Sequence, residues 1–163
     1  DDFCGQLLAH VPDLNGIDYD PCFTVMLALK GESLIPEPGA IRSPNSVIDW
    51  IADNSRKHDT GKSAAVTVHC SADFSRQYFD APHEDVAAAI IEAASPWLGC
   101  EVEAWQVHRW RYAKPRHSLA IPTVALGDKH PLLLCGDYLS ASARIEGAFD
   151  SGVAAAEHIL AHT

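Results

Sequence analysis

The stretches C-G-D-Y-L at residues 135–139 and R-I-E-G-A-F-D-S-G-V-A-A-A at residues 144–156 decide how the carboxyl-terminal part of this chain folds. The apolar run at 132–135 predicts a short buried strand that ends in Gly-Asp. From Ile145 onward, apolar residues recur every three or four positions as far as Leu160, which predicts an amphipathic helix. A buried strand, a Gly-Asp turn and a helix rich in small residues therefore follow one another directly.

This order of elements suits the binding of a polar ligand. Gly136 allows a bulky group to approach the backbone, and Asp137 can accept hydrogen bonds from sugar-like hydroxyls. The first amides of the helix lack intrahelical partners and together carry about half a positive charge. Gly147 and Gly152 each cost about 1 kcal/mol relative to alanine inside a helix. A flat ligand ring close to the helix, or tight packing of the helix on a strand, would explain them.

The rest of the chain predicts an α+β fold, with a mainly antiparallel sheet flanked by helices, because its strand patterns are joined mostly by hairpin-length connections. A short helix is expected at residues 3–10, and an exposed turn at 54–63. A longer helix is expected from Asp80 to Pro96, and residues 114–131 are expected to be irregular. We expect Trp50, Trp105 and His69 to pack in the core. The predicted strands before residue 114 are 22–29, 47–53, 64–70 and 102–112.

Composition excludes several kinds of partner. The chain has 163 residues, with 22 acidic against 12 basic residues and a net charge of -10, so nucleic acids and anionic membrane surfaces are disfavoured. No apolar run reaches the roughly 18 residues of a membrane-spanning helix. The five cysteines contain no C-x-x-C pair, so neither a zinc site nor a redox dithiol is indicated. Buried free thiols in a reducing cytoplasm are the expectation.

Several motifs resemble one protein family. G-D-Y-L and the following R-I-E-G-A-F-D-S-G-V-A-A-A are similar to the carboxyl-terminal FAD motif of the flavin-containing amine oxidase superfamily. The remaining motifs, in this order and spacing, are similar to the renalase-like branch of that superfamily. They are Y-D-P-C-F-T-V-M-L-A-L at 19–29, W-I-A-D-N-S-R-K at 50–57, T-V-H-C-S-A-D-F-S at 67–75 and H-R-W-R-Y-A-K-P at 108–115.

The resemblance implies FAD as the cofactor. It also implies oxidation of dihydronicotinamide dinucleotide isomers with O2 as the electron acceptor, which yields NAD(P)+ and H2O2. It implies a substrate-binding domain at residues 1–131 and a FAD-contacting strand–helix unit at 132–163. Asp137 would then bind the ribityl or pyrophosphate part of FAD, and backbone amides of the helix start would meet the flavin ring. The implied cofactor-binding residues are Gly136, Asp137, Arg144, Ile145, Glu146, Gly147 and Ala148.

One strand is expected to contact the substrate. His108, Trp110 and Tyr112 alternate along residues 102–112 and therefore share one face. In the resembling family this strand helps to wall the substrate cavity, and an imidazole with two aromatic rings suits stacking on a nicotinamide and hydrogen bonding to its carboxamide. The alternative is a half-buried strand in which Trp110 fills the core and His108 lies at its margin. No catalytic acid or base is predicted, because the cofactor accepts a hydride directly.

The chain departs from the family at its start. It begins at Asp1 and lacks the G-x-G-x-x-G unit that binds the adenosine and pyrophosphate, so we expect the carboxyl-terminal portion of a longer flavoenzyme, inactive alone. An uncovered apolar face on the closing helix would then pair two copies in a homodimer. Two alternatives remain open. One is an amine oxidase or desaturase relative with another substrate, and the other is a freestanding binding module without catalysis.

Overall fold

The computed structural model describes residues 16–57, 64–126 and 132–162. The helix expected at residues 3–10 lies outside the described residues. The chain forms two compact units. One unit is Asp20–Ala113, and the other combines Asp1–Tyr19 with Lys114–Thr163.

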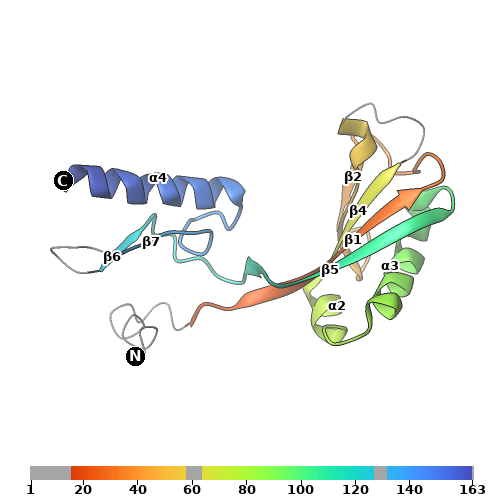
Figure 1. Ribbon diagram of the computed structural model, residues 1–163, viewed down its shortest axis with the longest axis horizontal. Coiled ribbons are helices and arrows are strands. Elements are labelled where there is room, and N and C mark those ends of the chain that lie inside the picture. The colour runs from red at the N-terminus through yellow and green to blue at the C-terminus, as the bar shows by residue number, and fades with distance from the viewer. Residues whose placement is uncertain (1–15, 58–63, 127–131, 163) are drawn as a thin grey trace. The chain divides into compact units, whose positions relative to one another are not determined.

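The Asp20–Ala113 unit contains a five-stranded sheet in the order β2-β3-β4-β1-β5 (Figure 1). The first residue of β1 and the last two residues of β5 lie beyond the bounds of this unit. The pairs β2–β3, β3–β4 and β1–β4 are antiparallel. Lys30 N donates to Glu101 O, so β5 begins where β1 ends, and this pair is antiparallel too. The predicted α+β fold with a mainly antiparallel sheet is confirmed. The strands are β1 Tyr19–Leu29, β2 Ala40–Arg42, β3 Ile48–Asp53, β4 Ala65–Cys70 and β5 Val102–Pro115.

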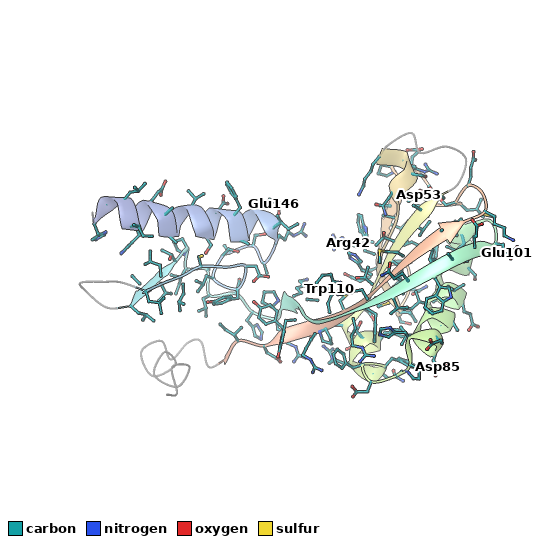
Figure 2. All side chains as sticks on the ribbon, viewed as in Figure 1. Arg42, Asp53, Asp85, Glu101, Trp110 and Glu146 are labelled. Atoms are coloured by element: carbon teal, nitrogen blue, oxygen red, sulfur yellow. The ribbon has the colours of Figure 1, made fainter. Side chains whose placement is uncertain are left out.

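Strict alternation of apolar residues builds the core of this unit. In β1, every second side chain from Phe23 to Leu29 is buried, and Val25 lies opposite Val68 of β4. Two helices, α2 Ala72–Gln77 and α3 His83–Leu98, supply the other wall of the core (Figure 1). The opposite face of the sheet carries polar and aromatic side chains. Figure 2 shows Arg42 and Trp110 on the side of the sheet away from α3.

The two helices depart from expectation in different ways. Helix α2 was not predicted, although Ser71 caps it by accepting a hydrogen bond from Phe74 N. Helix α3 was expected to stop at Pro96 but continues to Leu98. Pro96 removes only one hydrogen bond near the helix end, and the last turn is held because Trp97 O accepts from Leu34 N. Gly99, with φ of 75°, then ends the helix in the left-handed conformation.

Three residues expected in the core are partly or largely exposed. His69 is exposed and Trp50 is half-buried, because both lie on the face of the sheet that is opposite the helices. Trp105 is 42% exposed, since β5 is an edge strand. The prediction that these residues pack in the core is therefore wrong for His69 and Trp105. The sequence pattern placed these residues on strands correctly but did not indicate which part of the sheet would lack a covering layer.

The second unit holds a β-hairpin and a long helix. Strands β6 Val124–Leu126 and β7 Leu132–Leu134 pair antiparallel, with Val124 opposite Leu134. The expectation of irregular structure is wrong for residues 124–126, because three residues become a strand only through pairing with β7. Helix α4 Ile145–Ala161 forms where the sequence predicts it, but it buries the small residues Gly147, Ser151 and Ala155, whereas Ile145 and Phe149 of the predicted apolar series are exposed. No helix in the described part of the chain is long and apolar enough to cross a membrane.

Candidate functional site

A buried serine fixes the turn that follows β7. Gly136 adopts φ of 152° and donates its backbone N–H to Ser151 Oγ at 3.0 Å. Ser151, which is 1% exposed, donates its own hydroxyl to Pro122 O at 2.5 Å. One hydroxyl on α4 therefore satisfies a donor and an acceptor from two separate loops. Sequence analysis missed Ser151, and the only signal was a polar residue within the small-residue stripe of the helix.

Tyr19 orients the carboxylate of Asp137. The tyrosine hydroxyl donates to Asp137 Oδ1 at 3.0 Å, across 118 positions of sequence. Burial raises the pKa of Tyr19 to about 12, and the hydrogen bond to Asp137 adds to this shift. The hydroxyl is therefore protonated and a donor at neutral pH. A carboxylate has about four acceptor sites, so Asp137 keeps capacity for ligand hydroxyls. In the sequence, Tyr19 stands out only as the first residue of a family motif.

The first turn of α4 presents backbone donors. Arg144 is the N-cap residue, and no side chain caps the helix. The first intrahelical bond runs from Ala148 N to Arg144 O at 3.0 Å, so the Ala148 amide is not available to a ligand. The amides of Ile145, Glu146 and Gly147 precede that bond. Ile145 is 88% exposed, which leaves this turn open at the surface of its unit.

The two glycines of α4 differ in their surroundings. A Cβ on Gly147 would lie 2.0 Å from Ser142 O and 2.2 Å from Ser140 Oγ. The chain's own turn occupies this space, which favours tight packing over a flat ligand ring as the explanation of Gly147. A Cβ on Gly152 would meet no described atom within 4 Å. Packing therefore explains Gly147, and the described residues show no close contact at Gly152.

The predicted substrate-contacting residues lie on β5 of the other unit. Val107 is buried on the helix side, so by strand alternation His108, Trp110 and Tyr112 face the opposite way. The structure brings the rings of His108 and Trp110 together, at 4.2 Å between centroids. Trp110 is 51% exposed and Tyr112 is 74% exposed. The alternative in which Trp110 fills the core is therefore wrong.

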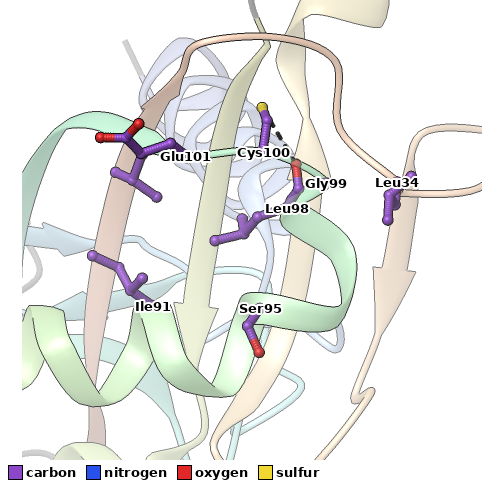
Figure 3. Close-up of a pocket in the computed structure, with 8 residues that line it drawn as sticks. Leu34, Ile91, Ser95, Leu98, Gly99, Cys100 and Glu101 are labelled. Atoms are coloured by element: carbon purple, nitrogen blue, oxygen red, sulfur yellow. Dashed lines mark hydrogen bonds between the residues drawn. The ribbon is translucent and has the colours of Figure 1, made fainter.

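A shallow pocket at the end of α3 is a weaker candidate. Its volume is about 440 Å³, and apolar side chains such as Leu34, Ile91 and Leu98 line most of it (Figure 3). Its carboxylate, on Glu101, is paired with Lys30 at 2.8 Å. Cys100 donates its thiol to a backbone carbonyl. The carboxylate and the thiol of the pocket thus have protein partners, and the mainly apolar lining does not select a particular ligand.

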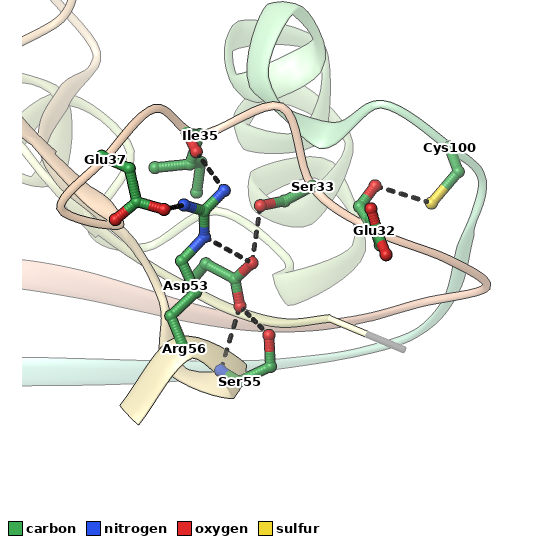
Figure 4. A network of polar contacts seen from close by, with 8 residues as sticks. All are labelled: Glu32, Ser33, Ile35, Glu37, Asp53, Ser55, Arg56 and Cys100. Atoms are coloured by element: carbon green, nitrogen blue, oxygen red, sulfur yellow. Dashed lines mark hydrogen bonds and ion pairs between the residues drawn. The ribbon is translucent and has the colours of Figure 1, made fainter. Parts of the chain in front are cut away.

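A buried carboxylate network serves the fold rather than a ligand. Asp53 is 5% exposed and accepts hydrogen bonds from Ser33 Oγ at 2.7 Å and from Ser55 N at 3.0 Å (Figure 4). Arg56 lies 3.7 Å from Asp53 and donates to Ile35 O at 2.6 Å. The network ties the loop around residues 33–35 to the 3-10 helix Asn54–Lys57. Its members satisfy one another, so it is a structural clamp.

Residues 8–160 match the family model described as flavin containing amine oxidoreductase. This family implies FAD, which supplies a hydride acceptor when bound. The residues around α4 fit such a group: the amides of Ile145, Glu146 and Gly147 suit an electron-rich ring edge, and the exposed guanidinium of Arg144 suits a phosphate. Asp137 suits ribityl hydroxyls. Because the match covers nearly the whole sequence, the chain belongs to the flavin containing amine oxidoreductase family, whose cofactor is FAD.

Proposed function

We propose that this protein is the substrate-binding and flavin-contacting part of a renalase-like oxidase. The reaction is the oxidation of a dihydronicotinamide dinucleotide isomer by O2. One hydride leaves the reduced ring, and with one further proton it converts O2 into H2O2, so that NAD(P)+ is the other product. The observation that carries the proposal is the exposed His108–Trp110 pair on the helix-free face of the sheet.

Each residue in the proposal has a separate task. Trp110 stacks on the flat nicotinamide ring, and His108 hydrogen-bonds the carboxamide, which offers both a donor and an acceptor. The amides of Ile145, Glu146 and Gly147 stabilise negative charge at the flavin edge that they contact. Transfer of a hydride needs no protein acid or base, so the chain contributes positioning and electrostatics. We also propose a cytoplasmic location, which the four free cysteines of the described residues support.

Anaerobic mixing tests the proposed reaction. Full-length protein with oxidised flavin is mixed with isomerised NADH, and the absorbance near 450 nm is followed; we expect the flavin to bleach within one turnover. Trp110→Ala should slow bleaching at least about tenfold, since it removes the stacking surface. Trp105→Ala, on the other face of the same strand, is the matched control and should leave the rate nearly unchanged. If isomerised NADH does not bleach the flavin, the proposed reaction is wrong.

The family description favours a second candidate, the oxidation of an amine. The same anaerobic assay with a panel of primary and secondary amines separates the two. Bleaching by an amine but not by isomerised NADH would assign the protein to the amine oxidases. Bleaching by the dihydronicotinamide isomer alone would favour the renalase-like reaction.

A further inference from the structure

A pair of histidines marks the carboxyl-terminal end of α4. His158 lies in the last turn and His162 is the C-cap residue, so they are four positions apart and project from one side of the helix. Their ring centroids are 4.3 Å apart, and the ring planes differ by only 19°. His162 is exposed and His158 is half-buried, so solvent reaches both residues. The two imidazoles therefore lie side by side at the surface, and neither the proposed flavin contacts nor the proposed reaction uses them.

One hydrogen bond fixes the tautomer of His162. Its Nδ1 lies 2.7 Å from the backbone oxygen of His158. A carbonyl oxygen only accepts hydrogen bonds, so Nδ1 carries the proton and donates it. In the neutral ring, Nε2 then keeps an unprotonated lone pair. Histidines that bind metal ions have this same arrangement, in which one ring nitrogen donates to a carbonyl or a carboxylate and the other binds the ion.

The separation of the two rings suits a chelated ion. Two imidazole nitrogens that bind one zinc ion at about 2.0–2.1 Å, in a tetrahedral arrangement, lie about 3.3 Å from each other. Rings with centroids 4.3 Å apart reach that separation by rotation about their own side-chain bonds. Among the residues that the structure describes, the His158 ring has no hydrogen bond that would hold it away from such an ion. Metal binding therefore requires no movement of the helix backbone.

The charges around this end of α4 favour a cation. The last carbonyl groups of a helix together carry about half a negative charge. The arginine nearest to the pair on this helix is the N-cap residue Arg144, which is 158 − 144 = 14 positions before His158 and about 21 Å away along the axis. The whole chain has a net charge of -10. The carboxylates on α4 are Glu146, Asp150 and Glu157.

We propose that His158 and His162 bind one divalent transition-metal ion per chain, such as Zn²⁺, through one nitrogen of each ring. Imidazole ligands favour Zn²⁺, Ni²⁺ and Cu²⁺, whereas Mg²⁺ and Ca²⁺ require oxygen ligands. In the described ranges, no group of three or more His, Cys, Asp or Glu residues could hold a metal, so the chain supplies two ligands and water fills the other positions. The ion links two successive turns and thereby stabilises the end of the helix.

Calorimetric titration with Zn²⁺ tests the site directly. Full-length holoprotein with oxidised flavin is titrated with zinc chloride, and we expect one ion bound per chain at this site. His158→Ala and His162→Ala should each weaken that binding at least about tenfold, because the second nitrogen no longer binds the ion intramolecularly. The double variant should lose little more than either single variant, since the two rings act on one ion. Added Mg²⁺ should not compete with Zn²⁺.

A variant with the same number of histidines at another spacing is the matched control. Ala156→His combined with His162→Ala places the two rings two positions apart, on different sides of the helix. This variant should bind Zn²⁺ as weakly as His162→Ala alone. His117→Ala removes an exposed histidine outside the helix and should change the affinity by less than twofold. Cys135→Ser removes an exposed thiol and should also leave the affinity unchanged.

Hydrogen exchange shows whether the ion acts on the helix end. Zn²⁺ should slow amide exchange in the last turn of α4 in the parent protein but not in His162→Ala, because the ion binds only the folded turn. The inference would be overturned if the parent protein binds no Zn²⁺, if it binds one ion per two chains, or if the respaced variant keeps the parent affinity. An equal loss of affinity in His117→Ala and His162→Ala would overturn it as well.

Discussion

At the scale of single residues, the hydroxyl of Tyr19 controls the proposed flavin contact of Asp137. Tyr19→Phe removes the donor to Asp137 Oδ1, so the carboxylate loses a fixed orientation. A hydrogen bond to a charged group contributes about 1.5–3 kcal/mol, of which part should appear in ligand affinity. We expect FAD to bind about fivefold to tenfold more weakly in a fluorescence-quenching titration.

The neighbouring tyrosine provides the control for this prediction. Tyr138 lies beside Gly136, with its ring 3.3 Å from the position of a Cβ on that glycine. Tyr138→Phe keeps the ring and removes a hydroxyl that is not bonded to Asp137, so FAD affinity should be retained. If both variants lose affinity equally, the Tyr19–Asp137 hydrogen bond has no specific role.

The ionised carboxylate of Asp53 should make the stability of the fold depend on pH. Burial alone would raise the pKa of Asp53, but the hydrogen bonds from Ser33 and Ser55 and the charge of Arg56 outweigh it, and the pKa lies below its usual value. The network therefore adds stability above the unfolded-state pKa of about 3.9, and this stability is lost as the pH falls through the lower folded-state value.

Asp53→Asn should lower the free energy of unfolding by about 2–3 kcal/mol at pH 7, measured by urea denaturation. The difference from the parent protein should shrink as the pH falls below about 4. Asp49→Asn is the control, because it removes the same charge at an exposed position of the same strand. It should lower the free energy of unfolding by less than about 0.5 kcal/mol. A deficit for Asp53→Asn that stays constant down to pH 2 would contradict the electrostatic explanation.

At the scale of elements, two glycines of α4 predict opposite outcomes for the same substitution. Gly147→Ala places a methyl group 2.0 Å from a backbone carbonyl and should destabilise the protein by about 1–3 kcal/mol. Gly152→Ala enters open space and should stabilise it by up to about 1 kcal/mol, because alanine favours the helix. Melting temperatures of the two variants check this. Equal shifts would mean that the turn at residues 140–142 yields to the added methyl group.

Elements with their own periodic pattern could be predicted from the sequence. The buried face of β1 and the amphipathic pattern of α4 are visible in single segments, because alternation and three-to-four spacing are local signals. The strands β2 and β6 have three residues each and exist through pairing with β3 and β7, so no local pattern indicates them. Helix α2 is short and carried only a capping serine as a signal.

The same distinction holds for the candidate site. Gly136, Asp137 and the first turn of α4 stand out because they are contiguous and chemically distinctive. Ser151 and Tyr19 were missed because their roles depend on partners that lie 15 and 118 positions away. Likewise, Trp50 was expected in the core because an aromatic strand residue gives no indication of which sheet face lacks a helix. Long-range contacts, rather than composition, determine the roles of Ser151 and Tyr19 and the burial of Trp50.

At the scale of the whole molecule, α4 has two apolar faces. The small residues Gly147, Ser151 and Ala155 are buried on one side. Ile145, at 88%, and Phe149, at 69%, are exposed on the other. An exposed apolar stripe of this kind marks an interaction surface. We define the outer stripe as Ile145, Phe149, Val153 and Leu160.

We expect the outer stripe to drive self-association of this 163-residue chain, which sedimentation velocity can measure between about 10 and 500 µM. The acidic residues Glu146 and Asp150 follow Ile145 and Phe149, and the chain carries a net charge of -10, so two copies repel each other at low ionic strength. Added salt screens that repulsion while leaving apolar burial intact, and the dimer fraction should therefore rise with salt.

A charged substitution within the stripe separates this association from nonspecific aggregation. Phe149→Asp should abolish the dimer, because it brings a carboxylate into the apolar contact. Leu34→Asp introduces the same charge at an exposed leucine of the Asp20–Ala113 unit and should leave the dimer fraction unchanged. A single monomeric species at the highest concentration would refute the prediction, and so would equal effects of the two variants, because association would then not depend on the outer face of α4.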